Sequence, residues 1–129
     1  MNIFGIGTDI VNIKRMENSL KKYGIKFKNK IFSKNEISYC EKKTNPSASY
    51  AKRFAAKEAF VKALGTGITK FISFKNIEVF NDNYGKPSIK LNNKIDNFLR
   101  RKIKKKKYNV YLSLSDDKPW AQATVIITY

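Results

Sequence analysis

The sequence predicts a single α+β domain in which antiparallel strands pack against a long central helix. Apolar residues of strand-like composition lie near both ends of the chain, over residues 2–11 and 121–129. Between them, a helical segment starts after the break at residues 44–47 and ends at Gly65. A length of 129 residues suits one hydrophobic core, and no linker or repeat divides the chain. We therefore expect one domain over residues 1–129.

Two shorter helices should precede the long one. After the first strand, which should be buried, residues 12–23 carry apolar side chains every three or four positions, as in an amphipathic helix. Ser33 and Glu36 have the spacing of a capping box. A second helix should therefore begin there and run to about residue 43.

Beyond Gly65 the pattern changes to strands with one helix among them. Alternating apolar residues predict the strands, and clusters of Asn, Asp, Gly and Pro predict the turns. The expected elements are a strand over residues 72–81, a turn over 81–87, a strand over 88–91, an amphipathic helix over about 95–103, a strand over 108–114, a turn over 115–119 and a final strand over 121–129.

The composition excludes several kinds of site. The chain has no histidine, so it lacks the usual base near neutral pH and cannot form a Ser-His or Cys-His triad. An enzyme with this sequence must use carboxylates, lysines, hydroxyls or a hard metal ion. Its single cysteine, Cys40, cannot form an internal disulfide, which favours a cytoplasmic location. No apolar run has the length of a membrane span, and the N-terminus does not resemble a secretory signal.

The net charge of +17 indicates a polyanionic partner, such as a nucleic acid, phosphates or an acidic protein. Of the 27 basic residues only four are arginines, and the lysines, asparagines and isoleucines suggest codon bias that inflates the charge. A small basic nucleic-acid-binding module is therefore an alternative interpretation, supported mainly by the polybasic run at residues 104–107. The same run also fits a solvated helix end, where cations complement the helix dipole.

Glu58 and Lys62 are the first candidates for chemistry. They lie four positions apart in the long helix, so their side chains share a face. Such a pair could hold a metal ion and a phosphate side by side. A surface ion pair followed by a glycine C-cap at Gly65 is the simpler alternative.

Asp9 is the second candidate carboxylate. It ends the first strand among apolar neighbours, where a charge is costly unless it is paired or bound to a metal. Asp9 and Glu58, with phosphate oxygens and water, would suit Mg²⁺, which prefers few protein ligands and oxygen geometry. Asp9 could instead cap the following helix.

The glycines are weak signals by themselves. Gly5-Ile6-Gly7 lacks the third glycine of a dinucleotide-binding fingerprint, and no Gly-Lys-Ser/Thr follows Gly65-Thr66-Gly67. The second segment is an ordinary helix stop that could also form a phosphate-binding nest.

Taken together, these segments resemble the signatures of the bacterial holo-[acyl-carrier-protein] synthases. Residues 5–11 with Ile13 and Arg15 are similar to the first signature, and residues 54–59 with 62–67 are similar to the second. Residues 80–87 and 121–127 resemble later blocks, in the same order and at the same spacing. The resemblance covers essentially the whole chain.

The resemblance implies a 4′-phosphopantetheinyl transferase. Such enzymes move the phosphopantetheine arm of coenzyme A to a serine of apo-acyl carrier protein, in support of fatty acid biosynthesis, and release adenosine 3′,5′-bisphosphate. By this resemblance Asp9 and Glu58 would bind Mg²⁺, and Glu58 would help to deprotonate the serine. Lys62 would neutralise the pyrophosphate of coenzyme A as the nucleotide leaves.

The resemblance also implies binding surfaces. Arg53, Gly65 and Thr66 would contact phosphates or the nucleotide, and Gly85-Lys86-Pro87 would line the coenzyme A cleft. The first helix would dock the acidic carrier protein through four basic residues: Lys14, Arg15, Lys21 and Lys22.

Similar proteins assemble as trimers with the active site between protomers. Many of them carry a histidine where this chain has Asp116, so a histidine role cannot be assigned here, and Asp116 could replace it as a base or water holder.

Overall fold

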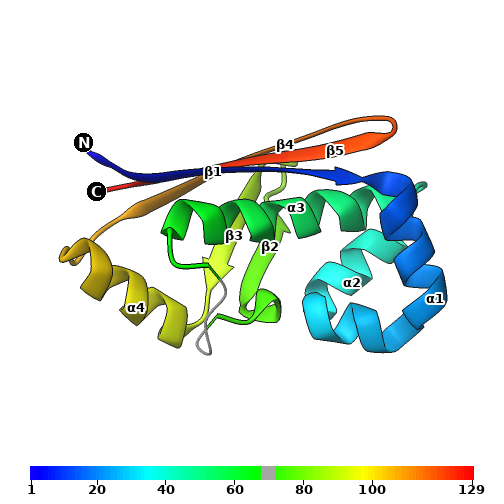
Figure 1. Cartoon of the computed structure of the whole chain (residues 1–129), viewed down its shortest axis with the longest axis horizontal. Helices are drawn as coiled ribbons and strands as arrows, with labels where there is room; N and C mark the ends of the chain where they lie inside the picture. Colours follow the sequence, from blue (N-terminus) through cyan, green and yellow to red (C-terminus); the bar gives the residue numbers. More distant parts are fainter. Residues whose placement is uncertain (68–71) are drawn as a thin grey trace.

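The computed structural model describes residues 1–67 and 72–129. Its main sheet has three antiparallel strands in the order β1-β5-β4, formed by β1 (Ile3–Asn12), β5 (Trp120–Thr128) and β4 (Asn109–Asp117). The long helix α3 (Pro46–Leu64) lies along one face of this sheet, and the other face is uncovered (Figure 1). The predicted α+β fold is confirmed.

The remaining elements lie on the helix side of the sheet (Figure 1). Helices α1 (Ile13–Ile31) and α2 (Lys34–Glu41) stand at one end of α3. A second sheet, the hairpin of β2 (Ile77–Asn81) and β3 (Pro87–Leu91), follows the short 3-10 turn Phe74–Asn76, and α4 (Asn93–Ile103) lies toward the other end. No helix in the described parts of the chain is long and apolar enough to cross a membrane.

The prediction of a buried first strand was wrong for one of its faces. Alternate side chains of β1 point away from α3, and the exposed fractions of Ile6 and Ile10 are both 59%. The inward positions are covered because α3 packs on them, whereas no element of residues 1–67 and 72–129 covers the outward positions.

Three predicted boundaries also differ. The first helix does not end at Tyr23, because the chain bends at Gly24, with φ of 58°, and then continues as helix to Ile31. The strand expected over residues 72–81 is confined to β2, after the 3-10 turn. The turn expected over residues 115–119 shortens to two residues, because strand pairing continues to Asp117 opposite Trp120.

Two glycines let α3 lie unusually close to β1. A Cβ atom on Gly5 would come within 1.8 Å of the carbonyl oxygen of Ala63, and one on Gly7 within 1.8 Å of that of Ala59. Any side chain at either position would therefore push the helix away from the strand. Small alanines on the facing side of α3 complete this contact, which places the inward side chain of Asp9 beside the helix.

A buried ion pair joins α2, α3 and the second sheet. Lys57 and Glu36 have fully buried side chains, and the Lys57 ammonium donates to Glu36 Oε1 at 2.7 Å. The same ammonium donates to the carbonyl oxygens of Phe74 and Ile77, at 2.7 and 2.6 Å. Its three protons therefore all have acceptors, as a buried lysine requires. Burial lowers the pKa of Lys57, and the Glu36 carboxylate opposes that shift.

Glu36 has further donors besides Lys57. The predicted capping box is confirmed, since the amide of Ser33 donates to Glu36 Oε1 at 2.9 Å. The amide of Val79 donates to Oε2 at 3.1 Å, which attaches strand β2 to the start of α2. One carboxylate thus caps a helix and holds a strand.

We predict that Lys57→Met lowers the free energy of unfolding by about 3–5 kcal/mol, because it leaves the Glu36 carboxylate buried without its counter-charge. Urea unfolding would measure the loss. Lys94→Met, at an exposed position of α4, is the matched control and should change stability by less than about 0.5 kcal/mol. The double variant Glu36→Gln/Lys57→Met should lose less than the sum of the two single variants. Equal losses for Lys57→Met and Lys94→Met would contradict a structural role for the pair.

Candidate functional site

Three charged side chains meet where α3 crosses β1. Asp9 points from the inner face of the strand, and Glu58 and Lys62 point from the helix. The Lys62 ammonium lies 3.0 Å from Asp9 Oδ1 and donates to the carbonyl oxygen of Thr8 at 2.9 Å. Lys62 therefore pairs with Asp9, not with Glu58 as a simple helix-surface pair would require. Asp9 does not cap α1, because Asn12 does so by accepting from the amide of Arg15.

The environment of Glu58 favours its protonated form. Partial burial raises the pKa of the Glu58 carboxyl above its ordinary value, and the negative charge of Asp9 raises it further. Lys62 opposes these two effects. Asp9 and Glu58 are thus close enough to repel one another, an arrangement that a cation between them would relieve.

Glu58 separates two hollows in the surface. One has a volume of about 540 Å³ and is lined by Asp9, Glu58 and residues of α1, including Arg15. The other, of about 400 Å³, is lined by Glu58, Val61, Lys62, Gly65 and Gly67. The second hollow lies at the C-terminal end of α3, where Gly65 has φ of 82° and ends the helix. A ligand in either hollow can reach the Glu58 carboxylate.

The four basic residues of α1 do not act alike. Lys14 and Lys21 both pair with Glu17, at 3.3 and 2.9 Å. Arg15 instead lines the hollow that contains Asp9 and Glu58, and Lys22, seven positions later, lies on the same side of the helix. The face with Arg15 and Lys22 is therefore the one that leads into the site.

Arg53 and the hairpin residues lie elsewhere. Arg53 is only 2% exposed; its guanidinium stacks on Tyr39 at 3.9 Å and donates to Asn81 Oδ1. Asn81 in turn donates to the carbonyl oxygen of Gly85 at 3.0 Å, so the arginine supports the β2–β3 turn. Neither Arg53 nor Gly85-Lys86-Pro87 lines the two hollows beside Glu58. The hydroxyl of Thr66 donates to the carbonyl of Gly67 at 3.2 Å.

Asp116 lies on β4, at the opposite edge of the main sheet from Asp9. It pairs with Lys52 of α3 at 2.9 Å, and strand β5 separates β4 from β1. Within one chain, Asp116 is thus not part of the group formed by Asp9, Glu58 and Lys62.

The donor set fits a hard cation that takes most of its ligands from elsewhere. Among residues 1–67 and 72–129, no group of three or more His, Cys, Asp or Glu side chains could hold a metal ion. Asp9 and Glu58 supply two carboxylates at the mouths of the hollows. Mg²⁺ commonly binds through one or two carboxylates together with water and substrate phosphates.

Sequence reasoning missed two aromatic residues of the larger hollow, Phe54 and Trp120. Phe54 precedes Glu58 by one helical turn, and that spacing could have indicated it. Trp120 is brought there only by strand pairing, opposite Asn12, and no local pattern marks it.

Comparisons with known proteins agree with this geometry. The profile of the 4′-phosphopantetheinyl transferase superfamily matches residues 5–123. A holo-[acyl-carrier-protein] synthase of Pelagibacter ubique is 45% identical over 127 residues, which cover 98% of each chain. The crystal structure of the Neisseria meningitidis synthase has a TM-score of 0.89 and 38% identity, covering 98% of this chain and 99% of that one. The Helicobacter pylori synthase, solved in complex with coenzyme A, has a TM-score of 0.83 and 34% identity, covering 95% and 99%.

These likenesses extend over nearly the whole chain and include the segments that hold Asp9, Glu58 and Lys62. They give no support to the nucleic-acid-binding interpretation. The fold, the convergence of charged side chains and the comparisons together show that the chain belongs to the 4′-phosphopantetheinyl transferase superfamily and, within it, to the holo-[acyl-carrier-protein] synthases.

Proposed function

We propose that this protein transfers the 4′-phosphopantetheine arm of coenzyme A to a serine of apo-acyl carrier protein. A serine oxygen attacks the phosphorus next to pantetheine, the pyrophosphate bond breaks, and adenosine 3′,5′-bisphosphate leaves. The observation that carries the proposal is the meeting of Asp9, Glu58 and Lys62 between two hollows. The relative from Helicobacter pylori that binds coenzyme A supports the choice of donor.

Each of the two hollows suits one of the two substrates. The hollow with Lys62, Gly65 and Gly67 offers the Lys62 ammonium and a left-handed glycine turn of the kind that can form a phosphate-binding nest, which suits the pyrophosphate and nucleotide. The hollow with Arg15 faces α1, which suits the approach of the carrier protein. Glu58 borders both, where the attacking oxygen and the reacting phosphate must meet.

Asp9 and Glu58 are the proposed ligands of Mg²⁺. When bound, this ion would neutralise the pyrophosphate oxygens and polarise the bond that breaks. Because the pKa of Glu58 is raised, protons compete with the cation there, and metal affinity should fall as the pH drops through that raised pKa.

Glu58 and Lys62 have proposed roles in the transfer itself. The raised pKa of Glu58 makes its carboxylate a stronger base than an ordinary glutamate, which suits it to accept the serine proton. Lys62 is 55% exposed, so its ammonium can turn from Asp9 toward a phosphate. There it would stabilise the charge that develops on the leaving nucleotide.

The site within one chain lacks some of the residues assigned to coenzyme A. Contacts of Arg53, Thr66, Gly85, Lys86 and Pro87 with the donor stay predictions. Since Arg53 and the hairpin residues line neither hollow of their own chain, we propose that the hairpin reaches the site of a neighbouring protomer. Asp116 would approach a neighbour's site in the same way.

The uncovered face of the main sheet supports such an assembly. Its outward side chains form cross-strand rows that include Ile6–Ile126–Tyr111 and Thr8–Thr124–Ser113. Gln122 donates to the hydroxyls of Thr8 and Thr124, at 3.0 and 2.7 Å. These two rows contain no charged residue, although 29% of the chain is charged, and the row at the end of the sheet, Asn12–Trp120–Asp117, carries a single carboxylate. Apolar and hydroxyl side chains in one exposed patch are typical of an interface, and we propose a homotrimer.

The carrier protein should dock on the α1 face that includes Arg15 and Lys22. An acidic helical partner would be steered there by charge and then placed beside Glu58. We also infer that the protein supports fatty acid biosynthesis in the cytoplasm, where an apo-acyl carrier protein would be its partner.

The first test is intact-mass spectrometry of apo-acyl carrier protein incubated with the protein, coenzyme A and Mg²⁺. We expect the carrier to gain one phosphopantetheine arm and EDTA to prevent the gain.

Glu58→Gln keeps the shape of the side chain but removes a ligand charge and the base, so transfer should fall by about a hundredfold or more. Glu78→Gln on β2 is the control and should retain activity. Unchanged transfer by Glu58→Gln at matched Mg²⁺ would reject the metal and base assignments.

The docking face can be tested by the charge reversals Arg15→Glu and Lys22→Glu. The KM for the carrier protein should rise by about tenfold or more, because charge steering is reversed, while coenzyme A binding stays unchanged. The control variant carries Lys94→Glu and Lys102→Glu on α4, with the same change in net charge. If both double variants weaken carrier use equally, no specific docking face exists.

The assembly can be tested by sedimentation of Ile6→Lys. A charge in the middle of the open sheet should dissociate the trimer, since an unpaired charge cannot be buried cheaply. Ile25→Lys changes another exposed isoleucine, 62% exposed on α1, and should leave the trimer intact. A wild-type protein that sediments as a monomer at assay concentrations would contradict the proposed homotrimer.

A further inference from the structure

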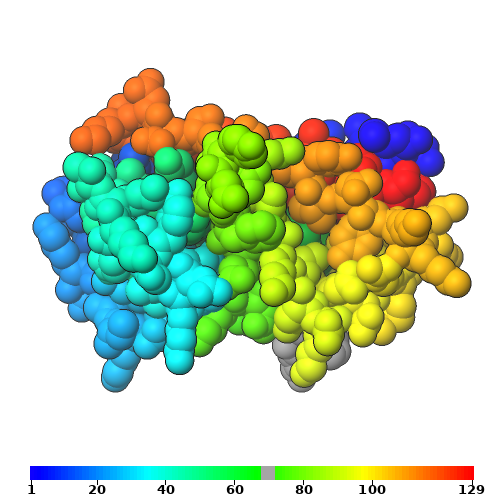
Figure 2. Space-filling view, turned by 180° about the vertical axis from the view of Figure 1, so that it is seen from behind, coloured from blue at the N-terminus to red at the C-terminus, as the bar shows by residue number. Residues whose placement is uncertain are grey.

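A groove of about 750 Å³ lies outside the proposed transfer site. Three segments form it: strand β3, helix α4 and the chain from Lys106 to Val110. In the space-filling view these segments, coloured yellow to orange, adjoin one another on the face opposite that of Figure 1 (Figure 2). The groove shares no residue with the hollows around Glu58, so the transfer reaction leaves it without a role.

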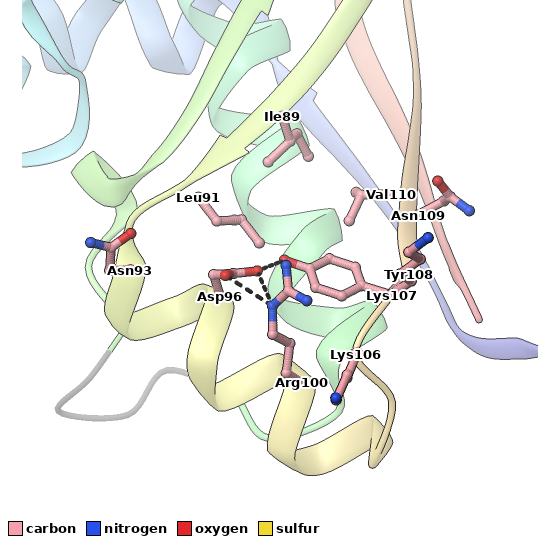
Figure 3. Close-up of a pocket in the computed structure, with 10 residues that line it drawn as sticks. All are labelled: Ile89, Leu91, Asn93, Asp96, Arg100, Lys106, Lys107, Tyr108, Asn109 and Val110. Carbon is pink, nitrogen blue, oxygen red and sulfur yellow. Dashed lines mark hydrogen bonds and ion pairs between the residues drawn. The ribbon is translucent and has the colours of Figure 1, made fainter.

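A cluster of three polar side chains occupies the centre of the groove (Figure 3). The Tyr108 hydroxyl donates to Asp96 Oδ1 at 2.5 Å, and Arg100 Nε lies 3.1 and 3.0 Å from the two carboxylate oxygens. The Arg100 guanidinium also lies 5.5 Å from the centroid of the Tyr108 ring. The hydrogen bonds that Tyr108 and Arg100 donate to Asp96 lower the pKa of its carboxyl. The carboxylate is therefore ionised and holds the guanidinium in one orientation.

The terminal nitrogens of Arg100 are not used by this cluster. Only Nε donates to Asp96, and neither terminal nitrogen donates a hydrogen bond to any of the described residues. An oriented guanidinium with two free NH₂ groups is a receptor for the oxygens of an anion. Because its rotamer is already fixed, less conformational entropy is lost on binding.

The charges around the groove favour a dianion. Arg100, Lys106 and Lys107 contribute three positive charges and Asp96 one negative charge, so the local sum is 3 − 1 = +2. A phosphate monoester carries about −1.5 to −2 charges at neutral pH, whereas a carboxylate carries one. The monoester therefore matches the groove better.

Three apolar residues also line the groove, together with Asn93 and Asn109. Ile89 and Leu91 of β3 and Val110 of β4 line it opposite Arg100, and all three are partly exposed (Figure 3). The volume exceeds what a phosphate alone would fill and lies in the range of small-molecule sites. The ligand should therefore carry an apolar body beside its phosphate, as an aryl or alkyl phosphate does.

We propose that this groove is a second anion site, which binds a phosphate monoester on Arg100, Lys106 and Lys107 and the apolar part of that ligand on Ile89, Leu91 and Val110. The site is independent of the proposed transfer function. Binding there needs neither Mg²⁺ nor coenzyme A.

The test is an amide NMR titration of the full chain with phenyl phosphate, in EDTA and without coenzyme A. We expect saturable shifts confined to residues 89–91, 96–100 and 106–110.

Arg100→Gln should weaken the binding of phenyl phosphate by about tenfold or more, because a charge-assisted hydrogen bond is lost. Arg101→Gln removes the same charge from the neighbouring residue of α4, which lines a different surface hollow with Lys94 and Phe98. That variant should bind within about twofold of wild type.

Other probes separate the parts of the proposal. Inorganic phosphate should bind more weakly than phenyl phosphate because it has no apolar body, and benzoate more weakly because it carries one charge. Equal weakening by Arg100→Gln and Arg101→Gln would reveal only general charge attraction and overturn the site. Shifts centred on Lys62 and Gly65 would place the anion in the transfer site and also overturn it. Glu58→Gln should lower transfer by about a hundredfold or more without changing this titration, so a failure of one proposal can be told from a failure of the other.

Discussion

The buried ion pair of Glu36 and Lys57 is the constraint on which the arrangement of the helices depends. It ties the start of α2, the middle of α3 and the entry to β2 to one point in the core. A charge with fewer partners could not remain there, since desolvation would outweigh the attraction. Because Lys57 directly precedes Glu58, the bonds that fix α3 also fix the direction in which Glu58 leaves the helix.

The close crossing of α3 over β1 brings the candidate site residues together. Gly5 and Gly7 permit backbone contact, and every second residue of β1 faces the helix, so Asp9 meets Glu58 and Lys62. Partial burial of Glu58, and then the nearby charge of Asp9, raise the pKa of Glu58, which links packing to the proposed metal and proton chemistry. Rigid elements, not loops, hold all three residues, and that suits a reaction dependent on alignment.

Under the proposed function, one chain supplies only part of what the transfer needs. The hairpin stabilised by Arg53 and Asn81 does not line the hollows of its own chain. No element among the described residues covers the outer face of the main sheet, where charged residues are scarce. Both features fit the proposed neighbouring copy, which would cover the sheet and contribute its hairpin, whereas the groove around Arg100 is formed within one chain.

The sequence by itself determined the α+β class, most elements, the capping box and the three candidate residues Asp9, Glu58 and Lys62. These depend on local signals, namely periodicity, caps and helix spacing. The residues alone did not decide whether Asp9 and Glu58 lie close together, and only the family resemblance indicated that they do. The tertiary structure decided the Lys62–Asp9 pairing, the burial of Lys57 and the exposure of one face of β1. Contacts between residues far apart in the chain depend on how the elements pack, and no local pattern encodes that.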